Sequence, residues 1–185
     1  NIYIASGYRS YAYQKVLYNQ YVNRDGKAEA DTYSARPGHS EHQTGLAIDL
    51  GLKKESIDFI RPDFPYIGIC QQFREKSVPY GFIERYPREK EHITGIAHEP
   101  WHFRYVGTPH AEIMREHHFC LEEYIDFLKR FSQDQPYTFY KDSQEIQIFY
   151  LKADTESVSL EVAEDGSLSV SGNNVDGYII TEWRG

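Results

Sequence analysis

The sequence lacks any apolar run long enough to cross a membrane, for which about 18 consecutive apolar residues would be needed. It also lacks runs of lysine and arginine, and 28 acidic against 20 basic residues give a net charge of −8. Nucleic acid and anionic lipid surfaces attract basic proteins, so neither is expected as the main partner. Small molecules and peptides remain as ligand classes.

Cysteine is scarce, since the chain contains only Cys70 and Cys120. Both lie in apolar surroundings and far apart, so they form no CxxC motif and are expected to be buried free thiols rather than a disulfide. Free thiols favour a cytoplasmic location. The chain also lacks an initiator methionine and begins at Asn1 inside a strand-like pattern. We therefore expect a fragment, and the alternative location is extracytoplasmic, with an anchoring segment upstream of residue 1.

The chain is organised around residues 38–50, which read GHSEHQTGLAIDL. From Leu46 to Leu50, apolar residues alternate with Ala47 and Asp49, which is the period of a half-buried strand. A carboxylate in such a strand needs a partner, because burying an unpaired charge is costly. His42 precedes the break at Gly45 and can fold back toward Asp49. The pair is interpreted as two ligands of a divalent metal, and a structural His/Asp hydrogen bond explains this segment equally well.

A second cluster lies at residues 98–106, HEPWHFRYV. Its first five residues satisfy the HExxH pattern of helical zinc proteases, but Pro100 sits at the centre, disfavours a helix and withholds a backbone donor. Alternation continues after His102, which indicates a strand. Glu99 and His102 are therefore expected on an extended turn that enters a strand, both directed at one point, with His98 as a structural neighbour.

If His102 joins His42 and Asp49, two imidazoles and one carboxylate surround a metal and leave a fourth position open for water, which is typical of catalytic zinc. Glu99 would lie near that water. It would take the proton as the water attacks and hand it to a leaving amine.

The remaining pattern predicts a mixture of helices and strands. A helix is expected from about Tyr11 to Tyr21, capped by Ser10, with Tyr13, Val16, Leu17 and Gln20 on one shared face. The other expected elements are a strand at 2–5, an irregular segment at 23–37, a surface excursion at 53–65, a helix at 69–76, one or two helices at 112–130, and β-type runs at 147–151, 158–162, 167–170 and 178–181.

Two domains are predicted, residues 1–131 as a catalytic domain and residues 137–185 as a small β appendage. The boundary lies near Ser132–Pro136, where the pattern changes from helical to short β runs. The appendage carries no evident chemistry, and the sequence leaves the oligomeric state open.

Three motifs resemble a known family. Residues 40–49 fit SxHxxGxAxD, residues 99–102 fit ExxH and precede RYVG, and residues 6–10, SGYRS, with Gln14 fit a third segment. In these motifs the chain resembles the zinc D-alanyl-D-alanine peptidases, which include the VanX, VanY and VanXY vancomycin-resistance enzymes. The resemblance runs from residue 3 to about 130 and is closest to the VanY and VanXY branch.

The resemblance implies an α+β fold in which a small antiparallel sheet bears a zinc site with flanking helices, plus a C-terminal β-hairpin appendage. It implies one Zn²⁺ per chain. The residues that match the family's functional positions are His42, Asp49 and His102 as metal ligands, Glu99 as catalytic base, Arg9 as the group that stabilises oxyanion charge, and Gln14, Ser40 and Trp101 near the substrate.

The implied reaction is hydrolysis of the terminal D-Ala-D-Ala bond of peptidoglycan precursors, with the free dipeptide as a further substrate. The alternatives are an L,D- or endo-specific peptidoglycan peptidase and a non-catalytic, zinc-bearing wall-binding module. The intact Glu99 and Arg9 argue against the binding module. The appendage and the missing upstream helices are where the chain departs from the family pattern.

Overall fold

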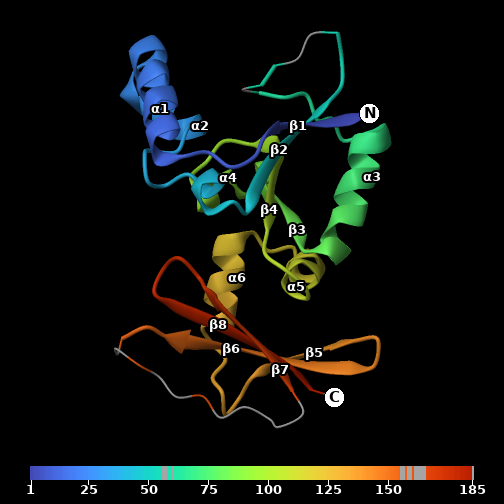
Figure 1. The fold of residues 1–185 in the computed structure, drawn as a ribbon. Coiled ribbons are helices and arrows are strands. Elements are labelled where there is room, and N and C mark those ends of the chain that lie inside the picture. The colour runs from blue at the N-terminus through green and yellow to red at the C-terminus, as the bar shows by residue number, and fades with distance from the viewer. Residues whose placement is uncertain (56–57, 60, 155–156, 158–159, 161–165, 185) are drawn as a thin grey trace. The chain divides into compact units, whose positions relative to one another are not determined.

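The described residues form two antiparallel sheets of four strands each, in separate parts of the chain (Figure 1). The structure is a computed structural model that describes residues 1–55, 58–59, 61–154, 157, 160 and 166–184. The chain divides into two compact units, Asn1–Cys120 and Leu121–Gly185. The α+β class with small antiparallel sheets is confirmed. The division into domains 1–131 and 137–185 stays a prediction, because it concerns whether each part folds independently.

The sheet of the first unit has the strand order β1-β2-β4-β3, with antiparallel neighbours throughout. Its strands are β1 (Ile2–Ser6), β2 (Ala47–Leu52), β3 (Phe82–Tyr86) and β4 (Glu99–Tyr105). The strands predicted from alternation at residues 2–5, 46–50 and 102–106 are thus found, while β3 was not predicted. The two central strands, β2 and β4, carry Asp49 and His102.

In the sequence, the helices of the first unit lie between its strands and after the last one. They are α1 (Tyr11–Asp25), α2 (Lys27–Tyr33), η1 (Glu41–Thr44), α3 (Gly68–Ser77), η2 (Val78–Tyr80), η3 (Arg88–Lys90), α4 (Glu91–Thr94) and α5 (His110–His117). Ser10 caps α1 as predicted, because its side chain accepts a hydrogen bond from the backbone nitrogen of Tyr13 at 3.2 Å.

One expectation for this region is wrong. The segment at 23–37 was expected to be irregular, but α2 occupies much of it, separated from α1 by Gly26 at φ +85°. Tyr13 and Val16 are more than half exposed, and the buried residues of α1 are Gln14 and Tyr18. A polar residue therefore faces inward here, which an apolar-periodicity argument could not find.

The core of the first unit lies on one face of its sheet. Leu50 of β2 and Phe103 of β4 pack there with Phe64 and Cys70, and α3 supplies Cys70. Phe103 is fully buried and makes edge contacts with the rings of Phe64 and Phe73. The predicted surface excursion at 53–65 thus ends in a buried residue, because Phe64 is 1% exposed.

In the described residues of the second unit, the strand order is β5-β6-β8-β7 and one helix precedes the sheet in the sequence. Its elements are α6 (Leu121–Leu128), β5 (Tyr137–Lys141), β6 (Gln144–Lys152), β7 (Ser167–Gly172) and β8 (Gly177–Arg184). The β runs predicted at 147–151, 167–170 and 178–181 are confirmed, and the run at 158–162 lies outside the described residues. The helical segment predicted at 112–130 forms two helices, α5 and α6, and α6 belongs to this unit.

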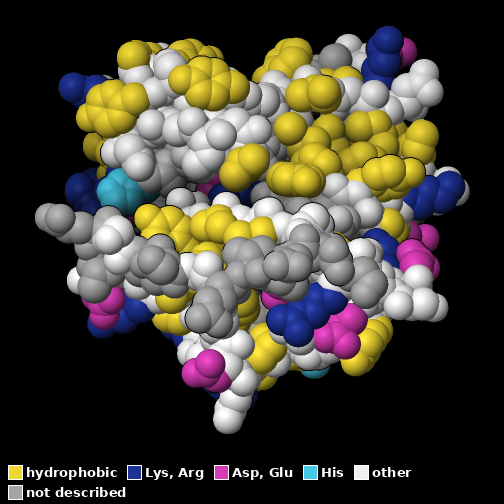
Figure 2. Space-filling view, turned by 60° about the horizontal axis from the view of Figure 1, so that its bottom comes forward, with side chains coloured by type: hydrophobic (Ala, Val, Ile, Leu, Met, Phe, Trp, Pro, Cys, Tyr) yellow, Lys and Arg dark blue, Asp and Glu magenta, His cyan; other side chains and the backbone are white. Residues whose placement is uncertain are grey.

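The surface carries mixed charge. Figure 2 shows lysine and arginine side chains scattered over the face in view, several of them beside aspartate or glutamate, with hydrophobic side chains between them. Among the described residues, no helix has the length and apolar character that a membrane crossing requires.

Replacing Phe103 tests the core behind the site. Phe103→Ala should lower the free energy of unfolding by about 3–5 kcal/mol, because the truncation leaves a cavity among packed rings. Urea unfolding measures the loss. Tyr80→Ala is the matched control, since Tyr80 is 74% exposed, and a similar loss in both variants would contradict the placement of Phe103 in the core.

Candidate metal and catalytic site

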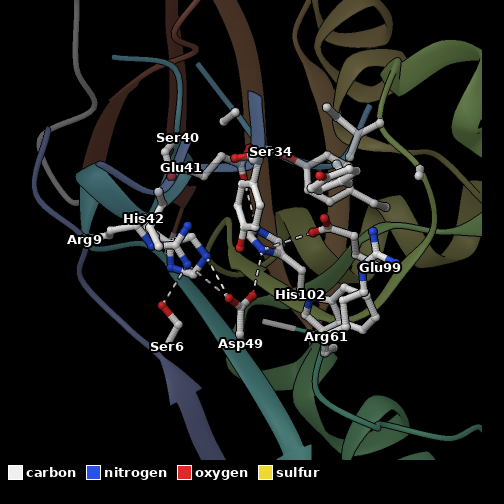
Figure 3. A pocket seen from close by; sticks show the side chains of 18 of the residues that line it. Ser6, Arg9, Ser34, Ser40, Glu41, His42, Asp49, Arg61, Glu99 and His102 are labelled. Atoms are coloured by element: carbon white, nitrogen blue, oxygen red, sulfur yellow. Dashed lines mark hydrogen bonds and ion pairs between the residues drawn. The ribbon is translucent and has the colours of Figure 1, made fainter. Parts of the chain in front are cut away.

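Three buried side chains from three elements meet at one point. His42 of η1, Asp49 of β2 and His102 of β4 each offer one ligand atom, and these atoms all lie within 4.8 Å of one another (Figure 3). Asp49 and His102 are direct partners in the antiparallel pairing of β2 with β4, so their side chains share a face. Gly45, at φ +75°, ends η1 and lets the chain turn back into β2.

Each imidazole has one nitrogen toward Asp49 and the other toward an outer partner. Nε2 of His42 lies 3.2 Å from Oδ2 of Asp49, and its Nδ1 lies 2.7 Å from the backbone oxygen of Gly7. Nδ1 of His102 lies 2.9 Å from Oδ1 of Asp49, and its Nε2 lies 3.4 Å from Oε2 of Glu41. In metal-binding histidines, one ring nitrogen binds the metal and the other bonds to an outer partner, which fixes the orientation of the ring.

The charges of this group are strongly coupled. Burial raises the pKa of Asp49, but hydrogen bonds with His102 and His42 outweigh it and hold that pKa well below the usual range. Burial lowers the pKa of His102, but hydrogen bonds with Asp49 and Glu41 raise it to about 9. Asp49 is therefore ionised at neutral pH, which suits a metal ligand.

Glu99 stands beside this group at the start of β4. Its Oε2 lies 3.7 Å from Nδ1 of His102. Burial raises the pKa of Glu99 to about 7, with the charge of His102 acting in the opposite direction. Residues 99–105 form a strand, so the helical HExxH arrangement is excluded as predicted. A carboxyl group with a pKa near 7 can accept and return a proton at neutral pH.

Arg9 approaches from the segment after β1. One guanidinium nitrogen lies 3.5 Å from Oδ2 of Asp49 and donates to the hydroxyl of Ser6 at 3.0 Å, while the other donates to Oε1 of Gln14 at 3.0 Å. The amide nitrogen of Gln14 donates to the backbone oxygen of Ala35 at 2.6 Å. Gln14 is 1% exposed, so these contacts support a role in holding Arg9, and the predicted substrate contact of Gln14 stays a prediction.

The site opens into a cavity of about 440 Å³. Ser40 and Trp101 line it, and Trp101 also packs against the core of the first unit. Arg9 lines the cavity, whereas Gln14, its hydrogen-bond partner, is not among the lining residues. The cavity continues from the metal-ligand group to α1 and α2, where its walls include Tyr13, Leu17, Tyr21, Glu29, Thr32 and Tyr33.

Sequence reasoning missed the support around His102. Glu41 binds two buried arginines, Arg85 of β3 and Arg104 of β4. The ring of Tyr86 packs on His102 with centroids 5.1 Å apart. The available signal was Glu41 itself, a charged residue directly before a candidate ligand, but its arginine partners lie far away in the sequence.

Comparison with known proteins agrees with this site. A family model described as "VanY: D-alanyl-D-alanine carboxypeptidase" matches residues 1–108. The chain belongs to the VanY family. The resemblance drawn from the three motifs is thereby confirmed, and the match includes every predicted site residue from Arg9 to His102.

One curated relative is the bifunctional D-Ala-D-Ala dipeptidase and D-Ala-D-Ala carboxypeptidase VanXYC of Enterococcus gallinarum. It is 46% identical over 129 residues, which are 69% of this chain and 68% of that protein. The chain spans about half the length of three further curated relatives, between 45% and 54%.

Two solved structures place the fold in the same family. The vancomycin resistance D,D-dipeptidase VanXYg, in complex with a D-Ala-D-Ala phosphinate analog, is 51% identical with a TM-score of 0.95, over 99% of this chain and 73% of that one. A mutant of the D,D-pentapeptidase VanY, in complex with Zn(II), is 36% identical with a TM-score of 0.55, over 67% of this chain and 71% of that one. The similarity to VanXYg includes the C-terminal sheet.

The coupling between Asp49 and His102 can be measured in the chelator-treated protein. Asp49→Asn should lower the pKa of His102 from about 9 toward its ordinary value of 6.5, because the strongest raising contact is lost while burial remains. NMR titration of the histidine ring signals measures this. Asp126→Asn, at an exposed position of α6, should leave the pKa of His102 unchanged, and an unchanged value in Asp49→Asn would refute the coupling.

Proposed function

We propose that this chain carries a zinc-dependent D,D-carboxypeptidase that hydrolyses the terminal D-Ala-D-Ala bond of peptidoglycan precursor peptides and also the free dipeptide. One observation carries the proposal: a buried His-Asp-His group lies 3.7 Å from a carboxyl group whose pKa is near 7, at the wall of a cavity. The relative VanXYC is named for both activities. Membership of the VanY family and the three matching motifs add to this support.

The residues present fit one zinc ion. Two imidazole nitrogens and one carboxylate oxygen within 4.8 Å of one another form a donor set that catalytic zinc prefers. His42, Asp49 and His102 would hold the ion, and the related VanY structure contains Zn(II). When bound, zinc polarises the scissile carbonyl and makes water a better nucleophile at neutral pH.

Glu99 is the proposed general base and acid. It lies beside the ligand group, and its raised pKa lets it take a proton from the attacking water and pass it to the leaving amine. Arg9 is the proposed donor to the oxyanion, because a guanidinium keeps its charge and offers several N–H groups. Contacts with Ser6 and Gln14 orient Arg9 before substrate arrives.

The cavity suits a peptide longer than a dipeptide. It continues past the ligand group to the aromatic residues Tyr21 and Tyr33, where further residues of a stem peptide would lie. Ser40 and Trp101 are proposed as substrate contacts at the reacting end, since both line the wall. The proposed partners are therefore peptidoglycan precursor peptides ending in D-Ala-D-Ala.

The cytoplasm is the compartment that we propose. Cys70 is a buried free thiol, which suits a reducing compartment. The substrate class agrees, because peptidoglycan precursor peptides are present there. An extracytoplasmic enzyme, anchored upstream of residue 1, is the alternative.

Release of D-alanine tests the proposed reaction. The chain should release D-alanine from D-Ala-D-Ala and from a pentapeptide stem ending in D-Ala-D-Ala, and release should stop after zinc chelation and return when Zn²⁺ is added. A tetrapeptide stem ending in a single D-alanine is the control for L,D-specificity. Cleavage of the tetrapeptide alone would replace the D,D-assignment with an L,D-carboxypeptidase, and no release from any substrate by the zinc-bound chain would contradict the peptidase proposal.

Replacing Glu99 separates catalysis from metal binding. Glu99→Gln should lower kcat for the pentapeptide by about 100- to 10,000-fold, because the amide cannot accept the proton of the attacking water. The variant should still bind one Zn²⁺, as measured by metal analysis after dialysis. Glu122→Gln, on α6 of the second unit, is a control for loss of a glutamate charge. Activity within a few-fold of the unaltered chain in Glu99→Gln would exclude Glu99 as the base.

A further inference from the structure

Glu41 contacts the metal-ligand group from outside. It precedes His42 in η1, yet its carboxylate turns toward β4, where Oε2 lies 3.4 Å from Nε2 of His102. Its Oε1 accepts a hydrogen bond from Nε of Arg85 at 2.8 Å and pairs with a guanidinium nitrogen of Arg104 at 2.9 Å. Both carboxylate oxygens are thus occupied, and Figure 3 shows Glu41 on the side of His102 away from Asp49.

The two nitrogens of His102 face two different carboxylates. Nδ1 faces Asp49 at 2.9 Å and Nε2 faces Glu41. A nitrogen that binds a metal carries no proton, so a neutral imidazole that binds through Nδ1 must carry its proton on Nε2. Glu41 is in position to accept that proton in a hydrogen bond. The contact therefore selects the tautomer in which Nδ1 is free for the metal.

The outer partners of the two histidines differ in charge. Nδ1 of His42 faces a neutral carbonyl, that of Gly7, whereas Nε2 of His102 faces an ionised carboxylate. A charged acceptor makes a stronger hydrogen bond and a more basic imidazole than a neutral one. His102 is therefore the ligand whose donor strength depends most on a single neighbouring side chain.

The arginines restrain Glu41, which itself lines the cavity. With Oε1 held by Arg85 and Arg104, the carboxylate is kept from rotating toward Asp49, where it would compete as a ligand. The strand pairing also favours the contact of Glu41 with these arginines. The pairing of β3 with β4 is irregular between Glu84 and Tyr86, around Arg85, and irregular pairing of this kind re-aims a side chain. In the pairing of β2 with β4, the residue opposite Arg104 is the small Ala47.

We propose that Glu41 is a positioning residue that fixes the tautomer and orientation of His102 for metal binding, with Arg85 and Arg104 holding it in place. The inference rests on the zinc site of the proposed function. It concerns the affinity of that site for the ion, so it can be tested without a peptide substrate.

Zinc affinity of Glu41 variants tests the inference. Competition with a chromophoric chelator should give an affinity about tenfold weaker for Glu41→Gln and about 100-fold weaker for Glu41→Ala, as expected for outer partners of metal ligands. In the zinc-bound variants, the ring nitrogen signals of His102 should shift in ¹⁵N NMR while those of His42 stay in place. A residue that only stabilises the fold would not produce this selective shift.

Glu84→Gln is the matched control. Glu84, on β3, is a similarly buried glutamate of the first unit, with side-chain exposure of 15% against 14% for Glu41, and it pairs with Arg74 at 2.8 Å. It should bind Zn²⁺ as tightly as the unaltered chain. Thermal unfolding of each chelator-treated variant checks folding, and Glu41→Gln, which preserves size, carries the test if Glu41→Ala does not fold.

The outcomes are distinct. Unchanged zinc affinity and unchanged His102 signals in the folded Glu41 variants would overturn the inference, as would an equal loss of affinity in Glu84→Gln. If the unaltered chain binds no Zn²⁺, the proposed function fails and the inference fails with it. If it binds Zn²⁺ but releases no D-alanine, only the peptidase assignment fails.

Discussion

A buried carboxylate is stable only where its charge is compensated, and the arrangement of the first unit follows from meeting this condition at Asp49. Two imidazoles and one guanidinium approach its oxygens, from η1, β4 and the segment after β1. The approach requires that β2 and β4 pair in the one register that places Asp49 opposite His102. A shift of one residue would turn the carboxylate into the core, so the register of the sheet and the site depend on each other.

Strand β4 joins the core to the chemistry because successive side chains point to opposite faces. Phe103 packs on Phe64 and Phe73, while His102 and Arg104 face the ligand group and Glu41. The orientation of a metal ligand is thus set by the aromatic packing on the other side of the same strand. A ligand on a packed strand loses less entropy on binding a metal than one on a loop would.

Local sequence patterns predicted the structural features that depend on residues close together in the sequence. The alternation at 46–50 gave β2, Pro100 excluded a helix through Glu99, and Ser10 marked the start of α1. The meeting of His42, Asp49 and His102 came from the family resemblance, because spacing alone cannot bring three segments together. Side-chain contacts were missed. Gln14 turns inward and accepts a hydrogen bond from Arg9, five residues before it, and the role of Glu41 depends on Arg85 and Arg104, which lie far from it in the sequence.

The separation of roles among the three carboxylates follows from how each is paired. Glu41 has two arginines and His102, which outweigh burial and lower its pKa to about 2, and Asp49 has two imidazoles and Arg9. For Glu99, the one ion-pair partner among the described residues is His102, at 3.7 Å. Burial therefore dominates at Glu99 and raises its pKa to about 7. Carboxyl groups whose environments separate their pKa values can serve as ligand and base in one site. Here arginines stabilise the ionised forms of Glu41 and Asp49, whereas Glu99 can exchange a proton near neutral pH.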